Sequence, residues 1–134
     1  MGVPIKTFRE LRCWRLAHEL RCEVIAICAR EPASRQLRFC DSFQDTAASV
    51  CRNLAEGFAR YESGEIVQFF RYALGSLAEL QEHLEDCKAR GYVDDPHFAR
   101  LQDLSEHTKA STLKFMKPHL ARRRSRKTPQ ARRT

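Results

Sequence analysis

Residues 53–80, NLAEGFARYESGEIVQFFRYALGSLAEL, decide the fold that the sequence predicts. They indicate the end of one helix, a short link at 61–64 and the first half of a second helix. In the second helix, apolar side chains recur at alternating spacings of four and three, which places them on one stripe of the helix surface. The stripe consists of Ile66, Phe70, Ala73, Leu77, Leu80, Leu84 and Cys87.

The helix before the link carries an apolar stripe with the same spacing. Its members are Cys40, Phe43, Ala47, Val50, Leu54 and Gly57. Because the link is so short, the two striped helices are expected to fold back on each other as an antiparallel hairpin. The rest of the chain then serves as cover for this hairpin, followed by a charged tail.

An earlier helix is expected to cover one side of the hairpin. A short helical lead-in around Phe8 precedes it, and its own stripe is Cys13, Ala17, Leu20, Val24 and Ile27. Pro32 ends this helix near Ala29, because proline cannot continue the backbone hydrogen-bond ladder. Ser34 is then a suitable N-cap for the second helix, predicted at 35–60.

The third helix is predicted from a cap at Ser63 to about Arg90, and the fourth from Asp95 to about Lys117. The fourth helix should stop before Pro118. Its apolar face is interrupted by hydroxyl residues, which predicts a partly polar interface; these are Ser105, Thr108 and Ser111. Four amphipathic helices with short connections predict an all-α fold, an antiparallel up-and-down four-helix bundle over residues 1–119.

Positive charge is concentrated in the last residues of the chain. The formal charge of the 134 residues is +7, and residues 121–134 hold seven bases and no acid, whereas the rest has as many bases as acids. The seven bases are Arg122, Arg123, Arg124, Arg126, Lys127, Arg132 and Arg133. Residues 120–134 lack the apolar area that would offset their ordering entropy, so we expect a disordered basic tail.

Such a tail has three interpretations. Flexible cations can neutralise phosphates and release counterions, which gives affinity for nucleic acid without sequence readout. The tail could instead keep the protein soluble, or bind an acidic protein partner. The nucleic-acid interpretation has the strongest physical case.

The six cysteines favour buried, reduced thiols over a disulfide scaffold, because most lie within predicted helices and no CxxC pair occurs. The N-terminal residues have no apolar signal region, and no window approaches the roughly 18 apolar residues of a membrane span. We therefore expect a cytoplasmic protein that does not bind membranes.

The sequence offers little chemistry for catalysis or metal binding. A di-iron bundle needs Glu-x-x-His motifs, and the sequence has none. Two His/Cys pairs at helical spacing, His18 with Cys22 and His83 with Cys87, could share zinc, but chance spacing is the favoured explanation. There is no phosphate-binding glycine loop, dinucleotide fingerprint or activated nucleophile. No catalytic residue, metal or cofactor is predicted.

Gly75 has two interpretations. It falls opposite the apolar stripe of its helix, where a glycine costs about 1 kcal/mol against alanine. It is either a tolerated surface glycine or the place where a helix of another subunit comes close.

The residues around Gly57 also have two interpretations. Asn53 and Glu56 could form a polar patch with Arg52 and Arg60. Alternatively, Glu56 and Arg60 are a stabilising pair four residues apart, and Gly57 allows the two hairpin helices to approach. The second interpretation is favoured.

The blocks FRELRCWRLAHEL (8–20), NLAEGFARYESGEIVQFFRYALGSLAEL (53–80) and ARGYV (89–93) resemble the four helix bundle proteins first noticed as reading frames within intervening sequences of bacterial 23S rRNA genes. That family is similar to the accessory variability determinant of diversity-generating retroelements, a pentameric, positively charged partner of reverse transcriptase and nucleic acid. The resemblance implies a ring-like homopentamer, contact with RNA or DNA, and a protein partner such as a reverse transcriptase. The resemblance assigns no catalytic residue to this sequence.

The sequence thus predicts a non-enzymatic nucleic-acid-binding accessory protein. Its candidate binding residues are the seven tail cations together with Arg52 and Arg60 on the bundle. The alternative is a structural or protein-interaction module without a nucleic-acid role.

Overall fold

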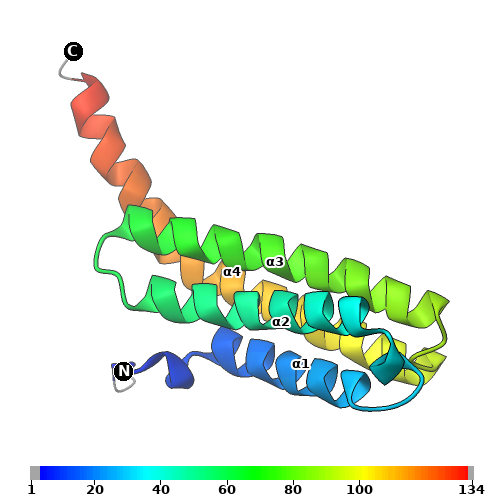
Figure 1. Ribbon diagram of the computed structural model, residues 1–134. Helices are drawn as coiled ribbons and strands as arrows, with labels where there is room; N and C mark the ends of the chain where they lie inside the picture. The colour runs from blue at the N-terminus through cyan, green and yellow to red at the C-terminus, as the bar shows by residue number, and fades with distance from the viewer. Residues whose placement is uncertain (1–3, 133–134) are drawn as a thin grey trace.

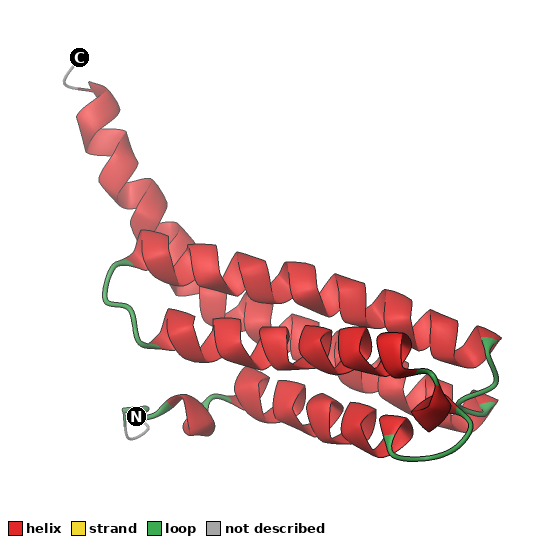
Figure 2. Cartoon of the chain, in the orientation of Figure 1, coloured by secondary structure: helices red, strands yellow, loops and turns green. Residues whose placement is uncertain are grey.

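The computed structural model of the protein describes residues 4–132, and the side chains of residues 4–123. Within that part of the chain there are four long helices and no strand (Figure 2). The helices are α1 (Arg12–Cys28), α2 (Leu37–Phe58), α3 (Ser63–Ala89) and α4 (Asp95–Arg132), with short 3-10 helices at Phe8–Glu10 and Ala33–Arg35. The all-helical prediction is confirmed.

The four helices lie side by side and make one helical body, whose two ends differ (Figure 1). Helix α1 packs against α2 and α4, and α3 packs against α2 and α4. We call the end with the 59–62 turn between α2 and α3 the turn end; the N-terminal lead-in, residues 5–11, lies there as well. The loop end carries the other two connections, 29–36 and 90–94. Beyond the turn end, α4 projects away from the body.

The apolar stripes predicted from the sequence form the core. Every predicted stripe residue of α1, α2 and α3 is buried, and the largest fully buried side chains include Phe43 and Phe70. Removal of this apolar surface from water is the main force that holds the helices together. The prediction of which faces meet is therefore confirmed.

Gly57 allows α2 and α3 to touch closely near the turn end. A Cβ atom built on Gly57 would lie 2.6 Å from Cδ1 and 2.7 Å from Cε1 of the buried Phe70 ring. Real Cβ atoms do not approach carbon so closely, so any larger residue would force the ring or the helix to move. The interpretation that Gly57 serves helix packing is confirmed.

The core-facing side of α4 is partly polar, as predicted. Ser105, Thr108 and Thr112 are buried, and each hydroxyl donates to a backbone carbonyl three or four residues earlier at 2.7–2.8 Å. These bonds offset the cost of burying the hydroxyls. Thr112 is buried more deeply than Ser111, which the sequence had suggested for this face.

The helix ends agree only in part with the prediction. Helix α2 begins only at Leu37, because residues 33–35 form a 3-10 helix, so Ser34 is not its N-cap. At the start of α4, Asp94 precedes the helix, and the His97 amide donates to Asp94 Oδ1 at 2.9 Å. Gly91 ends α3 with a positive φ of 76°, as expected for a glycine after a helix.

The expected helix end at Lys117 is wrong, since α4 continues through Pro118 to Arg132. Met116 is buried, and Leu120 packs against the core from the other side of the proline. This packing holds the backbone helical across the one amide hydrogen bond that proline removes. The separate disordered tail expected at 120–134 stays a prediction.

Candidate nucleic-acid interface

Basic and acidic side chains are distributed unequally between the two ends of the body. If each helix is divided near its middle, the turn-end half comprises residues 4–20, 48–72 and 107–123. It holds twelve Lys and Arg against five Asp and Glu. The loop-end half, residues 21–47 and 73–106, holds seven Lys and Arg against twelve Asp and Glu. A body that is nearly neutral in total is therefore strongly dipolar.

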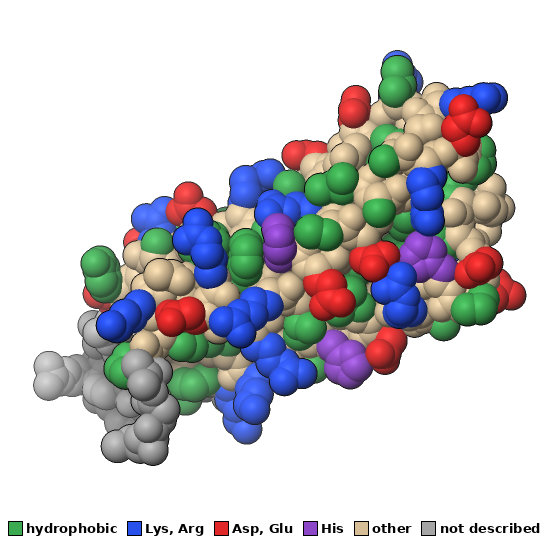
Figure 3. Space-filling view, turned by 90° about the horizontal axis from the view of Figure 1, so that it is seen from below, with side chains coloured by type: hydrophobic (Ala, Val, Ile, Leu, Met, Phe, Trp, Pro, Cys, Tyr) green, Lys and Arg blue, Asp and Glu red, His purple; other side chains and the backbone are tan. Residues whose placement is uncertain are grey.

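The space-filling view agrees with this count on the face that it shows. Lys and Arg side chains gather toward the turn end, and acidic side chains are more frequent toward the loop end (Figure 3). A surface with one sign of charge raises the local concentration of oppositely charged ligands and orients them as they approach. The turn end is thus the part of the described molecule suited to a polyanion.

The part of α4 that follows Glu106 contributes the largest share of the positive charge at this end. No acidic residue follows Glu106 in the sequence. Among the side chains that the structure describes, no ion pair is formed by the cations of this stretch: Lys109, Lys114, Lys117, Arg122 and Arg123. Their charges are available to an external anion.

The predicted tail residues begin on this helix. Arg122 is exposed and Arg123 is half-buried. The backbone stays helical at the next four predicted cations, whose side chains lie outside the described part: Arg124, Arg126, Lys127 and Arg132. Arg133 lies outside the described residues altogether.

Arg52 and Arg60, the two predicted residues on the body, line one hollow at the turn end. Its volume is about 580 Å³, and Asn53 and Glu56 line it as well. Arg60 donates to Glu56 Oε2 at 3.1 Å, while Arg52 lies 3.8 Å from Asp45 Oδ1 with 59% of its side chain exposed. The structure thus brings together the polar patch and the stabilising pair that the sequence left as alternatives.

A second hollow adjoins the first. Its volume is about 560 Å³, and the two hollows share Phe8, Ala55 and Ala59. We call the pair the aromatic groove, because its lining includes four aromatic side chains and four cations. They are Phe8, Phe58, Tyr61, Phe69, Lys6, Arg9, Arg52 and Arg60. Sequence reasoning missed this groove, because the lead-in and the α2–α3 turn meet only in the folded chain.

A third hollow at the turn end, of about 460 Å³, lies between the lead-in and α4. Arg12, Lys114 and Arg122 surround an apolar floor that includes Phe115. The ring of His119 also lines it, and its Nδ1 is buried with no hydrogen-bond partner among the described residues. Burial, and then the charge of Arg122, lower the pKa of His119, which disfavours the charged form of the ring.

The two His/Cys pairs at helical spacing make other contacts in the structure. His18 Nε2 lies 3.7 Å from Cys22 Sγ, but the ring stacks on Trp14. His83 contacts Ser42 Oγ at 3.1 Å through Nε2 and the backbone of its own helix through Nδ1. Throughout the described residues, no group of three or more His, Cys, Asp or Glu side chains is arranged to hold a metal ion.

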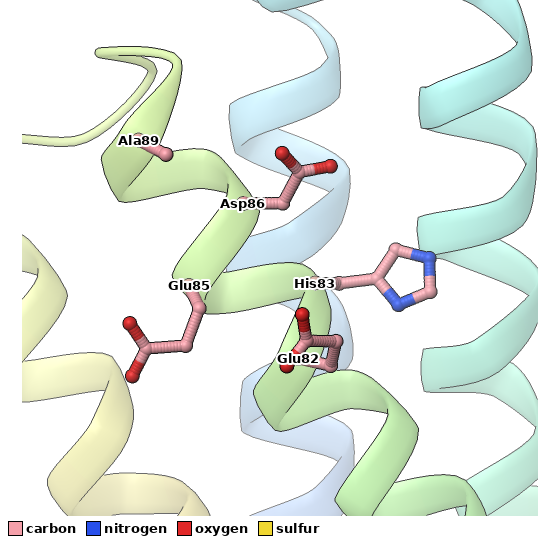
Figure 4. A pocket seen from close by; sticks show the side chains of 5 residues that line it. All are labelled: Glu82, His83, Glu85, Asp86 and Ala89. Carbon is pink, nitrogen blue, oxygen red and sulfur yellow. The ribbon is translucent and has the colours of Figure 1, made fainter.

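A further hollow lies along α3 near the loop end, and its side chains do not converge (Figure 4). His83 points toward α2, whereas Glu85 points the other way. The neighbouring Cys87 is fully buried, and burial raises the pKa of its thiol to about 12. A thiol with so high a pKa is a poor nucleophile and a poor metal ligand at neutral pH.

Fold and surface together define a class: a four-helix protein with one cationic, aromatic end and one acidic end. A family model described as 23S rRNA-intervening sequence protein matches residues 9–113, and the chain belongs to this family. No curated protein matches the chain. None of the helices in the described region combines the length and the apolar character needed to cross a membrane.

Proposed function

We propose that this protein is a non-enzymatic, cytoplasmic nucleic-acid-binding accessory protein that contacts the backbone of RNA or DNA with its turn end. The observation that carries the proposal is the separation of charge along the body. Twelve cations against five acids occupy the turn-end half, and α4 extends from that half with further arginines. A phosphate backbone is attracted to this half and repelled by the acidic half.

The side chains, and not the helix ends, would supply the affinity. The C-terminal end of α4 carries the negative pole of the helix dipole, which disfavours phosphate. Arginine side chains spaced along that helix overcome this effect, because each guanidinium can donate two hydrogen bonds to one phosphate. Such contacts give affinity that falls steeply with salt and depends little on sequence.

We further propose that the four helices form an antiparallel up-and-down bundle that assembles into a ring-like homopentamer. The family resemblance supports this assembly and a protein partner such as a reverse transcriptase. Gly75 faces outward on α3, and a Cβ added there would meet no other atom within 4 Å, which leaves room for a second helix. Five basic helices on one ring would bind a polyanion far more tightly than one.

The test is a salt series of binding, measured by fluorescence anisotropy with a labelled 20-nucleotide RNA and a labelled DNA duplex. We expect the full chain to bind both, and a chain that ends at Leu120 to lose most of the affinity. For each phosphate contact removed, the slope of log K against log salt should become shallower by about 0.7–0.9. Binding by the shortened chain at full strength would contradict the role of the C-terminal cations.

A pair of substituted chains separates charge from chain length. Replacing the seven predicted tail cations by glutamine keeps helix propensity but removes charge, whereas replacing the six arginines among them by lysine keeps the charge. The glutamine chain should bind weakly and the lysine chain should keep its salt slope. If no nucleic acid binds the full chain at low salt, the alternative of a protein-interaction module is favoured.

A further inference from the structure

We propose that the aromatic groove at the turn end binds unpaired bases, so that the protein prefers single-stranded nucleic acid to duplex. This inference rests on the proposed function and adds a ligand class to it. A surface made of cations alone would bind both forms through their phosphates. The groove adds rings that only exposed bases can reach, because the bases of a duplex are stacked inside it.

The rings of the groove come from separate segments of the chain. Phe8 is in the lead-in, Phe58 ends α2, Tyr61 is in the turn, and Phe69 lies on α3. Tyr61 is 97% exposed, the highest value among the large apolar and aromatic side chains of the described surface. Aromatic rings placed beside cations at a surface are the usual platform for stacking nucleic-acid bases.

The cations of the groove are interleaved with these rings. The Arg9 guanidinium lies 4.7 Å from the centre of the Phe8 ring, and that of Arg60 lies 4.9 Å from the centre of Phe69. Guanidinium groups over aromatic rings present flat, positively charged faces, on which bases can also stack. Among the described residues, Glu56 is the one acid that lines the two hollows, and its bond to Arg60 holds that guanidinium in place.

The size and floor of the groove fit nucleotides. Each hollow, at about 580 and about 560 Å³, falls within the roughly 300–1,000 Å³ typical of small-molecule sites. Ala55 and Ala59 line both, so a base can come close to the α2 backbone between the flanking rings. Two adjoining hollows with shared walls suit successive bases of one strand.

The lead-in wall of the groove is held in position before any ligand arrives. Glu10 Oε2 accepts hydrogen bonds from the backbone amides of Lys6 at 2.6 Å and Thr7 at 2.9 Å. Arg15 Nε donates to the Arg9 carbonyl at 2.8 Å, and the Phe8 ring packs edge-on against Trp14 at 5.1 Å. A wall that is already ordered loses less entropy on binding, which favours affinity.

The test compares Tyr61→Ala with Leu37→Ala, using a labelled oligo(U) 12-mer and an RNA duplex of equal length. Both side chains are exposed, so both variants should fold. Leu37 is the control because it lies at the loop end, away from the groove. We expect Tyr61→Ala to weaken single-strand binding on the order of tenfold, because a base–aromatic stack is lost. The same change should leave duplex binding and the salt slope unchanged, and Leu37→Ala should change neither. Tyr61→Phe, which keeps the ring, should restore single-strand affinity.

The outcomes separate this inference from the function on which it rests. If neither probe binds the full chain at low salt, the proposed function itself fails. If both bind equally well and Tyr61→Ala has no effect, phosphate binding stands and the base-binding groove is wrong. Loss of affinity for both probes in equal measure would also overturn the inference, because it would assign Tyr61 a general role.

Discussion

The two ends of the body use similar side chains to opposite effect. At the loop end, charges pair across helices: Glu23 of α1 accepts from Arg100 of α4 at 2.8 Å, and His97 lies 3.3 Å from the same carboxylate. At the turn end, the last described cations of α4 have no acidic partner in the described part of the chain. Charges that satisfy each other stabilise the fold, whereas the unmatched cations carry the nucleic-acid contact that we propose.

Aromatic rings show the same contrast. At the loop end, Phe39 packs on Phe43, His83 and Tyr92, and Arg90 covers its ring at 5.3 Å. At the turn end, the rings line open hollows. One aromatic and cationic cluster therefore closes the body, and the other faces solvent, where we propose that it binds nucleic acid.

The largest expected effect comes from neutralising cations at the turn end. Arg12, Lys114 and Arg122 surround the hollow between the lead-in and α4, and we expect their joint replacement by glutamine to lower RNA affinity on the order of 100-fold at low salt. Anisotropy with the labelled 20-nucleotide RNA measures the change.

The matched control carries the same change at the loop end. Arg30, Arg35 and Arg38 are exposed there, and their replacement by glutamine should change affinity by less than about threefold, because they lie far from the cationic end. Equal losses in the two triple variants would mean that only net charge matters, and the distinction between the ends would be lost.

Two glycines give the next largest effect, on folding. Gly57→Ala should destabilise the protein by about 2 kcal/mol in urea unfolding, because the new methyl group meets the buried Phe70 ring. Gly75→Ala should stabilise the fold of the single chain by about 0.5–1 kcal/mol, since an added Cβ meets no other part of that chain within 4 Å and alanine favours the helix. A shift in the same direction for both would contradict this difference in packing.

Gly75→Ala also tests the proposed assembly. If a helix of another subunit approaches this position, the substitution should lower the mass measured by light scattering while each chain remains folded. An unchanged mass would leave Gly75 as a tolerated surface glycine.

The ion-pair cluster of the loop end should contribute about 1 kcal/mol and depend on pH. The hydrogen bond from Arg100, and then His97, lower the pKa of Glu23 from its ordinary 4.5. A lowered pKa stabilises the fold above the unfolded value, and this contribution disappears as pH falls through the folded value. The protein and Glu23→Gln should therefore differ in stability near pH 7, and the difference should shrink as the pH falls through the lowered pKa of Glu23.

Unfolding in urea at several pH values measures that difference. Glu31→Gln is the control, because Glu31 pairs with Arg35 at an exposed site, where such pairs contribute little. A difference between the protein and Glu23→Gln that persists undiminished at about pH 3 would show that the carboxylate charge is not responsible.

The smallest expected effect concerns His119. Its lowered pKa means that the unfolded chain takes up a proton first as the pH falls below about 6.5, so acid weakens the fold. His119→Gln should flatten the dependence of stability on pH between about 7 and 5. An unchanged slope in His119→Gln would contradict the assignment of this pH dependence to the buried ring.

The sequence predicts the helix faces well, because the spacing of apolar residues follows directly from helix geometry. It fails at Pro118, where packing of Met116 and Leu120 outweighs the local preference of proline to end a helix. It also fails at the start of α2, where residues 33–35 take up a 3-10 helix.

For the candidate site, the sequence locates Arg52 and Arg60 but not the groove around them. Phe8 and Tyr61 are far apart in sequence and come together only because the lead-in packs beside the α2–α3 turn. The near-zero total charge of the body hides its dipolar character. Charges counted separately in alternate halves of successive helices would have exposed it, once the helices were assumed to run up and down.

The most direct test of a nucleic-acid site at the turn end is to map bound RNA on the protein by backbone amide chemical shifts. An oligo(U) 12-mer is titrated into the isotope-labelled full chain at low salt, and the chemical-shift changes of the backbone amides are followed along the sequence. We expect changes at residues 6–15, 52–62 and 109–123, and none at 28–40 or 85–97. Changes centred on the loop end, or spread evenly over both ends, would contradict the assignment of binding to the turn end.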